Sequence, residues 1–301
     1  MHQFETGSDL QVEFDSLRPG ESTQQGATRR TALKTVIGVG YAAAALPIAA
    51  QTVVKTSSEG LKAGPIKYAV NGFDVPAYAA APVGKTGLPV VLVVQEIFGV
   101  HEYIADTCRR FAQAATWHRA RPLRAAGRRQ ELHRHSEVDG RRRRQGAHAQ
   151  VMADLDGALK YAAANGGNVA NAGITGFCWG GRITWLYAAT GKVKAGVAWY
   201  GRLVGQPGAL TPRHPIDIAT GLQAPVLGLY GGKDQGIPLD TVDKMKAVLA
   251  TGSAAAKASK FVVYPDAGHA FHADYRPSYM MGAADDGWNR ALAWFSANGV
   301  V

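Results

Sequence analysis

Short apolar runs alternate with amphipathic stretches along most of the chain beyond residue 65. Runs of mainly apolar residues, typical of strands buried in a parallel sheet, occupy residues 89–96, 172–175, 193–200, 224–231 and 260–264. Segments with a helical pattern lie between or after them, at 101–115, 152–164, 182–189, 239–249 and 283–297. Strands that alternate with helices predict a parallel, helix-covered sheet, and therefore an α/β fold.

A β-hairpin is predicted ahead of this alternation. Residues 66–70 and 73–79 both carry alternating apolar side chains, and Asn71-Gly72 lies between them. Asn-Gly is the dipeptide most typical of a two-residue hairpin turn. The polar residues 52–64, which come before the hairpin, are interpreted as a linker.

Residues 1–51 are interpreted as an N-terminal extension with an export signal. The twin arginines Arg29-Arg30 precede an apolar stretch at 36–50. A basic start, a short apolar region and small residues at its end are typical of a cleaved signal, and a membrane span needs about 20 apolar residues. We expect the twin-arginine translocation machinery to export the folded chain to the periplasm or beyond, with cleavage near Ala50 and no permanent membrane anchor. An uncleaved anchor or a chance apolar run is the alternative.

Residues 116–148 differ in composition from everything around them. They contain ten arginines and four histidines but no lysine. A solvated basic loop or a nucleic-acid-binding arm is one interpretation, yet the segment has no amphipathic period, and such a long loop is rare inside a compact domain. Our hypothesis is a pair of compensating frameshifts in a GC-rich gene. Codons for residues 115–118, read one base earlier, can encode Gly-Tyr-Leu-Ala, which would open a strand.

The charge of the chain does not indicate a nucleic-acid partner. The net charge is +10, but the ten arginines and three acidic residues of 116–148 alone give +7. Most of the basic excess is therefore local. The chain has two cysteines, Cys108 and Cys178, which make a disulfide framework improbable and match no metal-binding motif. We expect no cofactor.

The sequence Gly-Phe-Cys-Trp-Gly-Gly at residues 176–181 is the most informative motif. It follows the apolar run 172–175 and precedes the helical pattern 182–189, so it predicts a strand, a sharp turn and a helix. Small residues two positions before and after Cys178 are what a strained nucleophile elbow requires. The motif therefore predicts a nucleophilic thiol, and a buried cysteine in a glycine-rich turn is the alternative.

Three other residues with catalytic chemistry follow predicted strands. They are Glu96, Asp234 and His269. Active groups of such sheets lie at the carboxyl ends of the strands, and the order nucleophile, acid, histidine along the chain is that of an α/β-hydrolase. His269 would take the proton of the Cys178 thiol, and Asp234 would hold the imidazole tautomer. Taken singly, a residue like His269 is more often a loop histidine and one like Asp234 a turn residue, but their joint position at ordered strand ends favours the triad.

Glu96 ends an apolar strand beside the predicted elbow. A buried carboxylate without a partner costs several kcal/mol, so we interpret Glu96 as a group that governs ionisation of the thiol. A carboxylate turned to solvent or paired with an arginine is the alternative. The backbone amides of Ile97 and Trp179 would form an oxyanion hole.

These residues resemble the dienelactone hydrolase family. The resemblance covers about residues 66–295, interrupted at 116–148, and implies one α/β-hydrolase domain at 65–301. It rests on Gln-Glu-Ile-Phe-Gly-Val at 95–100, the elbow at 176–181, Gly-Gly-Lys-Asp at 231–234 and Ala-Gly-His-Ala-Phe at 267–271.

The resemblance implies hydrolysis of an enol-lactone, of the carboxymethylenebutenolide type, through a thioester on Cys178. Asp234 and His269 would complete a catalytic triad, and Glu96 would take up the thiol proton when substrate binds. No cofactor is implied.

The chain departs from the family where the substrate carboxylate is bound. One family arginine would lie within 116–148, and another would lie four residues after the histidine, where this chain has Ala273. Arg276 could replace it, although a surface arginine is an equal alternative. Tyr200 and Trp179 could line the pocket or simply pack in the core.

Three other functions remain open. The first is a carboxylesterase of different specificity. The second is a non-catalytic product, since translation of 116–148 as written would remove one core strand. A basic binding module is the third.

Overall fold

The computed structural model describes residues 54–117, 142–208 and 211–301. The export-signal prediction and most of the suspected frameshift fall on residues outside these ranges. None of the described helices is long and apolar enough to cross a membrane.

The predicted hairpin is confirmed. Strands β1 (Leu61–Val70) and β2 (Phe73–Pro82) pair antiparallel, with Val70 opposite Phe73. Between them, Asn71 and Gly72 have φ angles of 51° and 82°, in the left-handed region that Asn and Gly adopt most readily. This backbone is the one that a tight hairpin turn requires.

The predicted linker at 52–64 is wrong at its carboxyl end, because β1 already begins at Leu61. At the start of β1, half-buried residues alternate only weakly with exposed ones. The sequence therefore shows no clear apolar–polar alternation there. Ahead of β1, the backbone amide of Val54 donates to Asp274 Oδ2 at 2.8 Å and that of Thr56 donates to Asp106 Oδ1 at 2.6 Å. These bonds attach the segment to the folded domain.

A five-stranded parallel sheet forms the centre of the fold, with its strands side by side in chain order. The strands are β3 (Leu88–Val94), β4 (Gly167–Phe177), β5 (Ala195–Trp199), β6 (Val226–Gly231) and β7 (Lys260–Tyr264). The predicted parallel sheet is therefore confirmed, with bounds that differ by a few residues.

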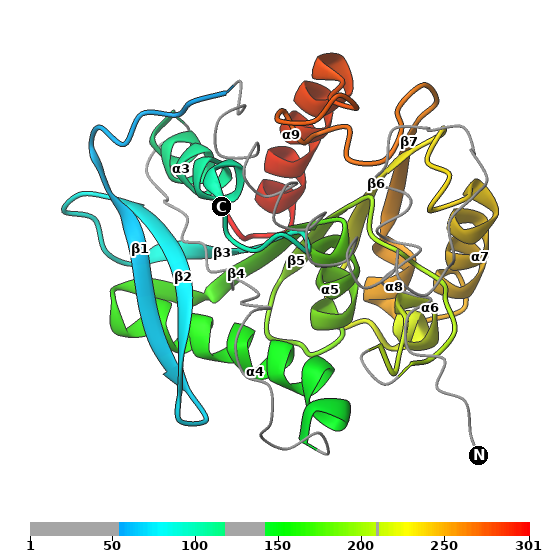
Figure 1. Ribbon diagram of the computed structural model, residues 1–301, viewed down its shortest axis with the longest axis horizontal. Coiled ribbons are helices and arrows are strands. Elements are labelled where there is room, and N and C mark those ends of the chain that lie inside the picture. Colours follow the sequence, from blue (N-terminus) through cyan, green and yellow to red (C-terminus); the bar gives the residue numbers. More distant parts are fainter. Residues whose placement is uncertain (1–53, 118–141, 209–210) are drawn as a thin grey trace, which may run out of the picture.

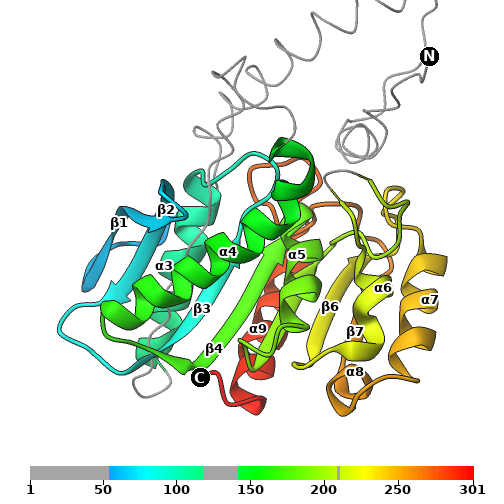
Figure 2. The same cartoon turned by 90° about the horizontal axis from the view of Figure 1, so that it is seen from below.

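Helices cover both faces of this sheet (Figures 1 and 2). α3 (Glu102–Trp117) and α9 (Met281–Ala297) lie on one face, and α4 (Arg142–Ala164) and α5 (Trp179–Ala188) lie on the other. Short α6 (Pro215–Ile218), a 3₁₀ turn (Ala219–Gly221), α7 (Leu239–Leu249) and α8 (Ala254–Ala258) flank the last strands. α4 begins ten residues before the predicted 152, because arginine, glutamine and alanine favour helix without giving an apolar signal.

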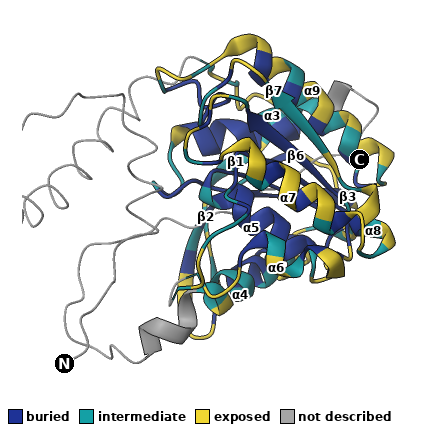
Figure 3. Cartoon of the chain, turned by 90° about the vertical axis from the view of Figure 1, so that its right-hand side faces the viewer, coloured by how far each residue is buried: buried dark blue, intermediate teal, exposed yellow. Residues whose placement is uncertain are grey.

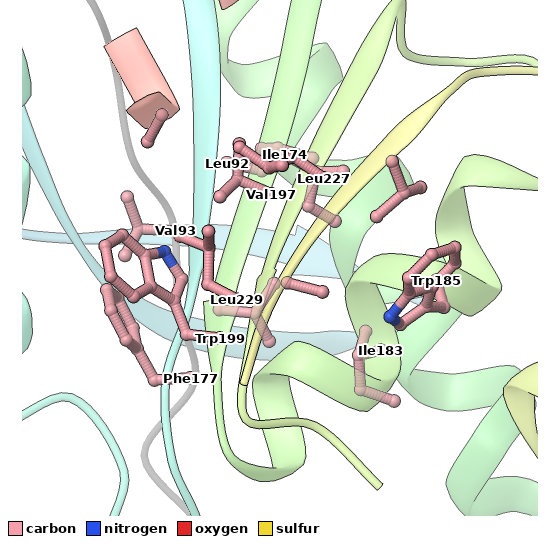
Figure 4. Packing of buried hydrophobic residues seen from close by; sticks show 14 of the residues in the cluster. Leu92, Val93, Ile174, Phe177, Ile183, Trp185, Val197, Trp199, Leu227 and Leu229 are labelled. Carbon is pink, nitrogen blue, oxygen red and sulfur yellow. The ribbon is translucent and has the colours of Figure 1, made fainter. Parts of the chain in front are cut away.

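Apolar side chains of the strands fill the core. Leu92, Ile174 and Leu229 are almost completely buried, and Trp199 and Trp185 pack around them (Figure 4). Exposed residues lie mainly on the helices and loops that surround the strands (Figure 3). Helices cover both faces of the sheet, and this explains why its strands are continuous apolar runs in the sequence.

The hairpin and the five-stranded sheet are separate sheets within the described residues. β3 is buried along its whole length, yet the edge away from β4 pairs with no described strand. α3 contacts β1, β2 and β3, and α4 contacts β1, β3 and β4, so the two helices connect both sheets. The segment between these helices, residues 118–141, lies outside the described residues.

Candidate active site

Cys178 stands at a strained turn between β4 and α5. Its φ and ψ angles are 54° and −114°, a conformation that side chains other than glycine rarely adopt and that costs about 1–3 kcal/mol. Its amide donates to the Trp199 carbonyl at 3.0 Å, and its carbonyl accepts from the Arg182 amide at 3.1 Å. The turn therefore has the backbone geometry predicted for a nucleophile elbow.

Two glycines allow this turn to form. A Cβ atom on Gly176 would lie 2.2 Å from the Gly180 carbonyl oxygen, and one on Gly180 would lie 2.3 Å from the Val94 carbonyl oxygen. Both distances are far below van der Waals contact. The start of α5 is thus packed against the end of β3. That strand ends at Val94, two residues before Glu96.

Asp234 and His269 come together from two separate loops. Asp234 follows β6 and His269 follows β7, and the His269 Nδ1 atom lies 2.7 Å from Asp234 Oδ2. The other oxygen of Asp234 accepts from the amides of Gly236 and Ile237 at 2.9 and 3.2 Å. The carboxylate is therefore fixed in place, and it holds the imidazole with Nε2 available on the opposite side.

The Cys178 thiol interacts with this imidazole. Burial lowers the pKa of His269, but the charge of Cys178 and hydrogen bonds with Asp234 and Cys178 outweigh it and raise the pKa to about 10. No other described residue offers a well-aligned hydrogen bond to His269 Nε2, as is common before substrate binds. Asp234 therefore holds the imidazole and Cys178 interacts with the same ring, so the three residues predicted as a triad lie together.

Glu96 is completely buried directly after β3. The hydroxyl of Tyr275 donates to Glu96 Oε2, and His101 Nε2 lies 3.9 Å from the same oxygen. Glu96 Oε1 has no hydrogen-bond partner among the described residues. The solvent-turned alternative for Glu96 is therefore wrong, because the end of β3 is covered by the loop that carries Tyr275.

Arg276 lies in the same cluster and is half-buried. Its guanidinium lies 4.9 Å from the centre of the Phe98 ring, and its Nε donates to the Tyr275 hydroxyl at 3.3 Å. Burial disfavours its charge, but Glu96, Tyr275 and the more distant Cys178 raise the pKa of Arg276 above its ordinary value. A cation is thus held within electrostatic reach of both Glu96 and the nucleophile.

Tyr200 lies beside the catalytic histidine. It has a φ of 39°, is fully buried, and places its ring edge-on to His269 with a centroid separation of 5.2 Å. Trp179 is the first residue of α5, so its amide is one of the unpaired donors of a helix start. Ile97 follows Glu96 and is buried, beside the contact between Gly180 and the end of β3.

Sequence reasoning missed two residues of the site, Tyr275 and His101. Both are aromatic, and their rings meet edge-on at 5.0 Å. Burial is the main cause that lowers the pKa of His101 to about 4, against the charge of Glu96, so the ring is neutral at pH 7. The sequence gives one hint to these two residues, which is that each lies next to a predicted site residue or motif. Tyr275 precedes Arg276, and His101 follows the 95–100 motif.

Comparisons with known proteins agree with this geometry. A sequence model of the dienelactone hydrolase family matches residues 75–299. A Methylorubrum extorquens protein named "Putative carboxymethylenebutenolidase" is 50% identical, and the match covers 96% of this chain and 99% of the relative. An Escherichia coli K12 protein of the same name is 48% identical over 86% of this chain and 96% of its own length.

A solved structure supports the same assignment. It is a "Putative Dienelactone Hydrolase" from Klebsiella pneumoniae, 47% identical, with a TM-score of 0.69 over 78% of this chain and 98% of its own. The predicted resemblance and the α/β-hydrolase fold are therefore confirmed. The chain belongs to the dienelactone hydrolase family, and it is a hydrolase of that family.

Proposed function

We propose that this protein hydrolyses small lactones or esters through a thioester on Cys178. The observation that supports this most is the buried Cys178, held in a strained turn, next to an imidazole that Asp234 fixes at 2.7 Å. A buried cysteine that only packs in a glycine-rich turn would not need a histidine fixed by a carboxylate beside it. The comparisons support a carboxymethylenebutenolidase-like substrate, and the covalent step is our own inference.

The first half of the reaction forms the acyl-enzyme. The thiolate of Cys178 attacks the carbonyl carbon, and the oxygen of that carbonyl gains negative charge. The amides of Ile97 and Trp179 would donate to this oxygen, as in other oxyanion holes. The carbon–oxygen ester bond then breaks, and the leaving oxygen takes a proton from the His269 imidazolium.

The second half releases the acid. His269, now neutral, takes a proton from water, and the hydroxide oxygen attacks the thioester carbon. The carbon–sulfur bond breaks, and the thiolate and the imidazolium form again. Asp234 keeps the same hydrogen bond throughout and stabilises the charged imidazole. Water thus replaces the proton that the imidazolium gave to the leaving oxygen, and the enzyme returns to its starting state.

The substrate would carry a carboxylate near the reacting carbonyl. Arg276 provides a half-buried cation beside Phe98, which suits a planar anionic substrate. Ala273, which stands where the family has an arginine, is itself fully buried. Tyr200 would line the pocket beside His269. A carboxylesterase of different specificity is the second candidate, because the arginine position has changed.

Mass spectrometry after exposure to p-nitrophenyl acetate tests the acyl-enzyme. We expect one acetyl group on Cys178 in the wild type and none in Cys178→Ala. Cys108→Ala is the matched control, since Cys108 is equally buried in α3 but has no histidine partner in the described residues. Acetylation that persists in Cys178→Ala would reject the proposal. A panel of lactones and neutral esters then separates the two candidate specificities.

We also propose that the twin-arginine machinery exports this chain, on the evidence of Arg29-Arg30 and the apolar residues 36–50. Replacement of both arginines by lysine keeps the charge but removes the twin-arginine pattern. Fractionation of cells that express the two forms should then show the wild type in the periplasm and the variant retained. Equal periplasmic amounts would reject this proposal.

A further inference from the structure

Two buried carboxylates hold residues 54–56, a segment called the strap below. Thr56 donates its amide to Asp106 Oδ1 at 2.6 Å and its hydroxyl to Asp106 Oδ2 at 3.2 Å. The Val54 amide donates to Asp274 Oδ2 at 2.8 Å. Asp106 and Asp274 are 0% and 4% exposed, so water is poorly placed to replace these donors. Loss of a donor to a buried carboxylate is costly, and the strap is therefore part of the folded domain.

Arg110, in α3, connects the two carboxylates. Its Nε atom donates to Asp106 Oδ2 at 2.6 Å, and its Nη2 atom lies 3.6 Å from Asp274 Oδ2. The contact from Val54 is thus the shorter of the two that Asp274 Oδ2 makes. Asp274 Oδ1 has no hydrogen-bond partner among the described residues. If Asp106 lost a donor, it would draw Arg110 closer to itself and away from Asp274.

Asp274 lies inside a tight turn that leads to Arg276. The Arg276 amide donates to the Ala273 carbonyl at 2.9 Å, which closes the turn around Asp274. The Arg276 guanidinium lies 4.9 Å from the centre of the Phe98 ring, in the candidate site. Because Asp274 and Arg276 are two residues apart in a closed turn, a shift of Asp274 also moves Arg276.

We propose that the strap is a positioning segment, which holds Asp274 and thereby keeps the Arg276 guanidinium where the carboxylate of an anionic substrate binds. The inference rests on the proposed function, which assigns that carboxylate to Arg276. The hydrogen bonds of the strap go to Asp106 and Asp274 and do not involve the triad. Loosening the strap should therefore weaken the use of anionic substrates and spare neutral ones.

The experiment compares kcat/KM for carboxymethylenebutenolide with kcat/KM for its neutral primary amide. Val54→Pro removes the amide that Asp274 accepts, because proline has no backbone N–H. The preference for the anionic lactone should fall about tenfold, because a small misplacement of a binding group is costly, while kcat/KM for the amide stays within about twofold. A fold that was merely destabilised would lose both activities together.

Ser58→Pro is the matched control. Ser58 is exposed, and its amide donates no hydrogen bond within the described residues. This variant should keep the wild-type preference. An unchanged preference in Val54→Pro, or the same loss in Ser58→Pro, would overturn the inference.

Arg276→Ala tests whether the effect of the strap passes through Arg276. In that background, Val54→Pro should leave the remaining preference in place, because changes that act through one residue do not add. A further loss as large as that in the wild-type background would show a route that bypasses Arg276, and the inference would be wrong.

A second pair of variants covers the case in which Val54→Pro does not fold. Thr56→Val nearly keeps the shape of the side chain but removes the hydroxyl that Asp106 accepts, whereas Thr56→Ser retains a hydroxyl. The preference for the anionic lactone should fall in Thr56→Val and recover in Thr56→Ser. Wild-type preference in Thr56→Val would contradict the role of the strap. Absence of Cys178 acetylation in the wild type would instead reject the proposed function.

Discussion

His269 lies beside two groups that favour its protonated form, Asp234 and the Cys178 sulfur. Opposite charges favour the protonated ring, and here they outweigh the effect of burial. In the proposed reaction, the imidazole would therefore act as an acid that is already charged. Its partners also decide which nitrogen faces the thiol, because Nδ1 is occupied by Asp234.

We expect the His269 ring to titrate near pH 10 in a nuclear magnetic resonance experiment, instead of near its ordinary 6.5. Cys178→Ser removes the negative sulfur, which supports the charged ring, so the midpoint should move downward. Asp234 alone would then oppose the desolvation of the ring. An unchanged midpoint in Cys178→Ser would show that the sulfur carries no charge beside the histidine.

Asp234→Asn should lower kcat by roughly 10²–10⁴-fold, because an amide can hold the wrong imidazole tautomer and cannot stabilise the charged ring. Steady-state hydrolysis of p-nitrophenyl acetate measures this. Asp266→Asn is the control, since Asp266 is exposed and pairs only with Lys233 at 2.8 Å. A loss under about threefold in Asp234→Asn would contradict the assigned role.

The elements themselves were well predicted wherever the hydrophobic pattern had one clear period. The bounds of α7 and β7 agree with the sequence to the residue. The pattern failed where burial is partial or the helix formers are polar, as at the start of β1 and of α4. Glycine positions in the elbow were predicted because their spacing is a local requirement of the turn.

The site was predictable only in part, for a related reason. Cys178, Asp234 and His269 follow strands, so the edge of a parallel sheet collects them. Tyr275 and His101 lie within loops, and their positions depend on how those loops fold back over Glu96. No periodicity in the sequence carries that information.

Gly180→Ala should disrupt the contact between α5 and β3. The added methyl group would lie 2.3 Å from the Val94 carbonyl oxygen, and relief of the clash must shift backbone, at a cost of about 1–3 kcal/mol. Urea unfolding should show lower stability, and hydrolysis should fall because the elbow moves. Gly282→Ala, with open space around it in α9, should be neutral or slightly stabilising. Wild-type stability in Gly180→Ala would refute the argument.

The described residues of the whole molecule form two sheets, and two helices connect them. α3 and α4 lie on opposite faces and each contacts both the hairpin and β3. Consecutive right-handed crossovers that reverse direction place their helices on opposite faces in this way.

Replacement of residues 116–148 by the alternative reading frame should raise the melting temperature by about 10 °C. A buried strand adds several kcal/mol, and each kcal/mol moves the midpoint of a domain this size by about 2–4 °C. Differential scanning calorimetry of the two proteins measures the change. Resequencing that gives one continuous frame through residues 116–148 would reject the frame hypothesis, and an unchanged midpoint would contradict the expected gain in stability.

The attachment of Val54 and Thr56 to the domain has a consequence for maturation. Asp274, which receives the Val54 amide, is the neighbour of Tyr275 in the loop that reaches over Glu96. A cut near residue 50 would leave this attachment whole, whereas trimming only a few residues further would deprive Asp274 of its donor. Under the proposed export, the position of the cut would therefore decide whether Asp274, next to Tyr275, keeps this contact.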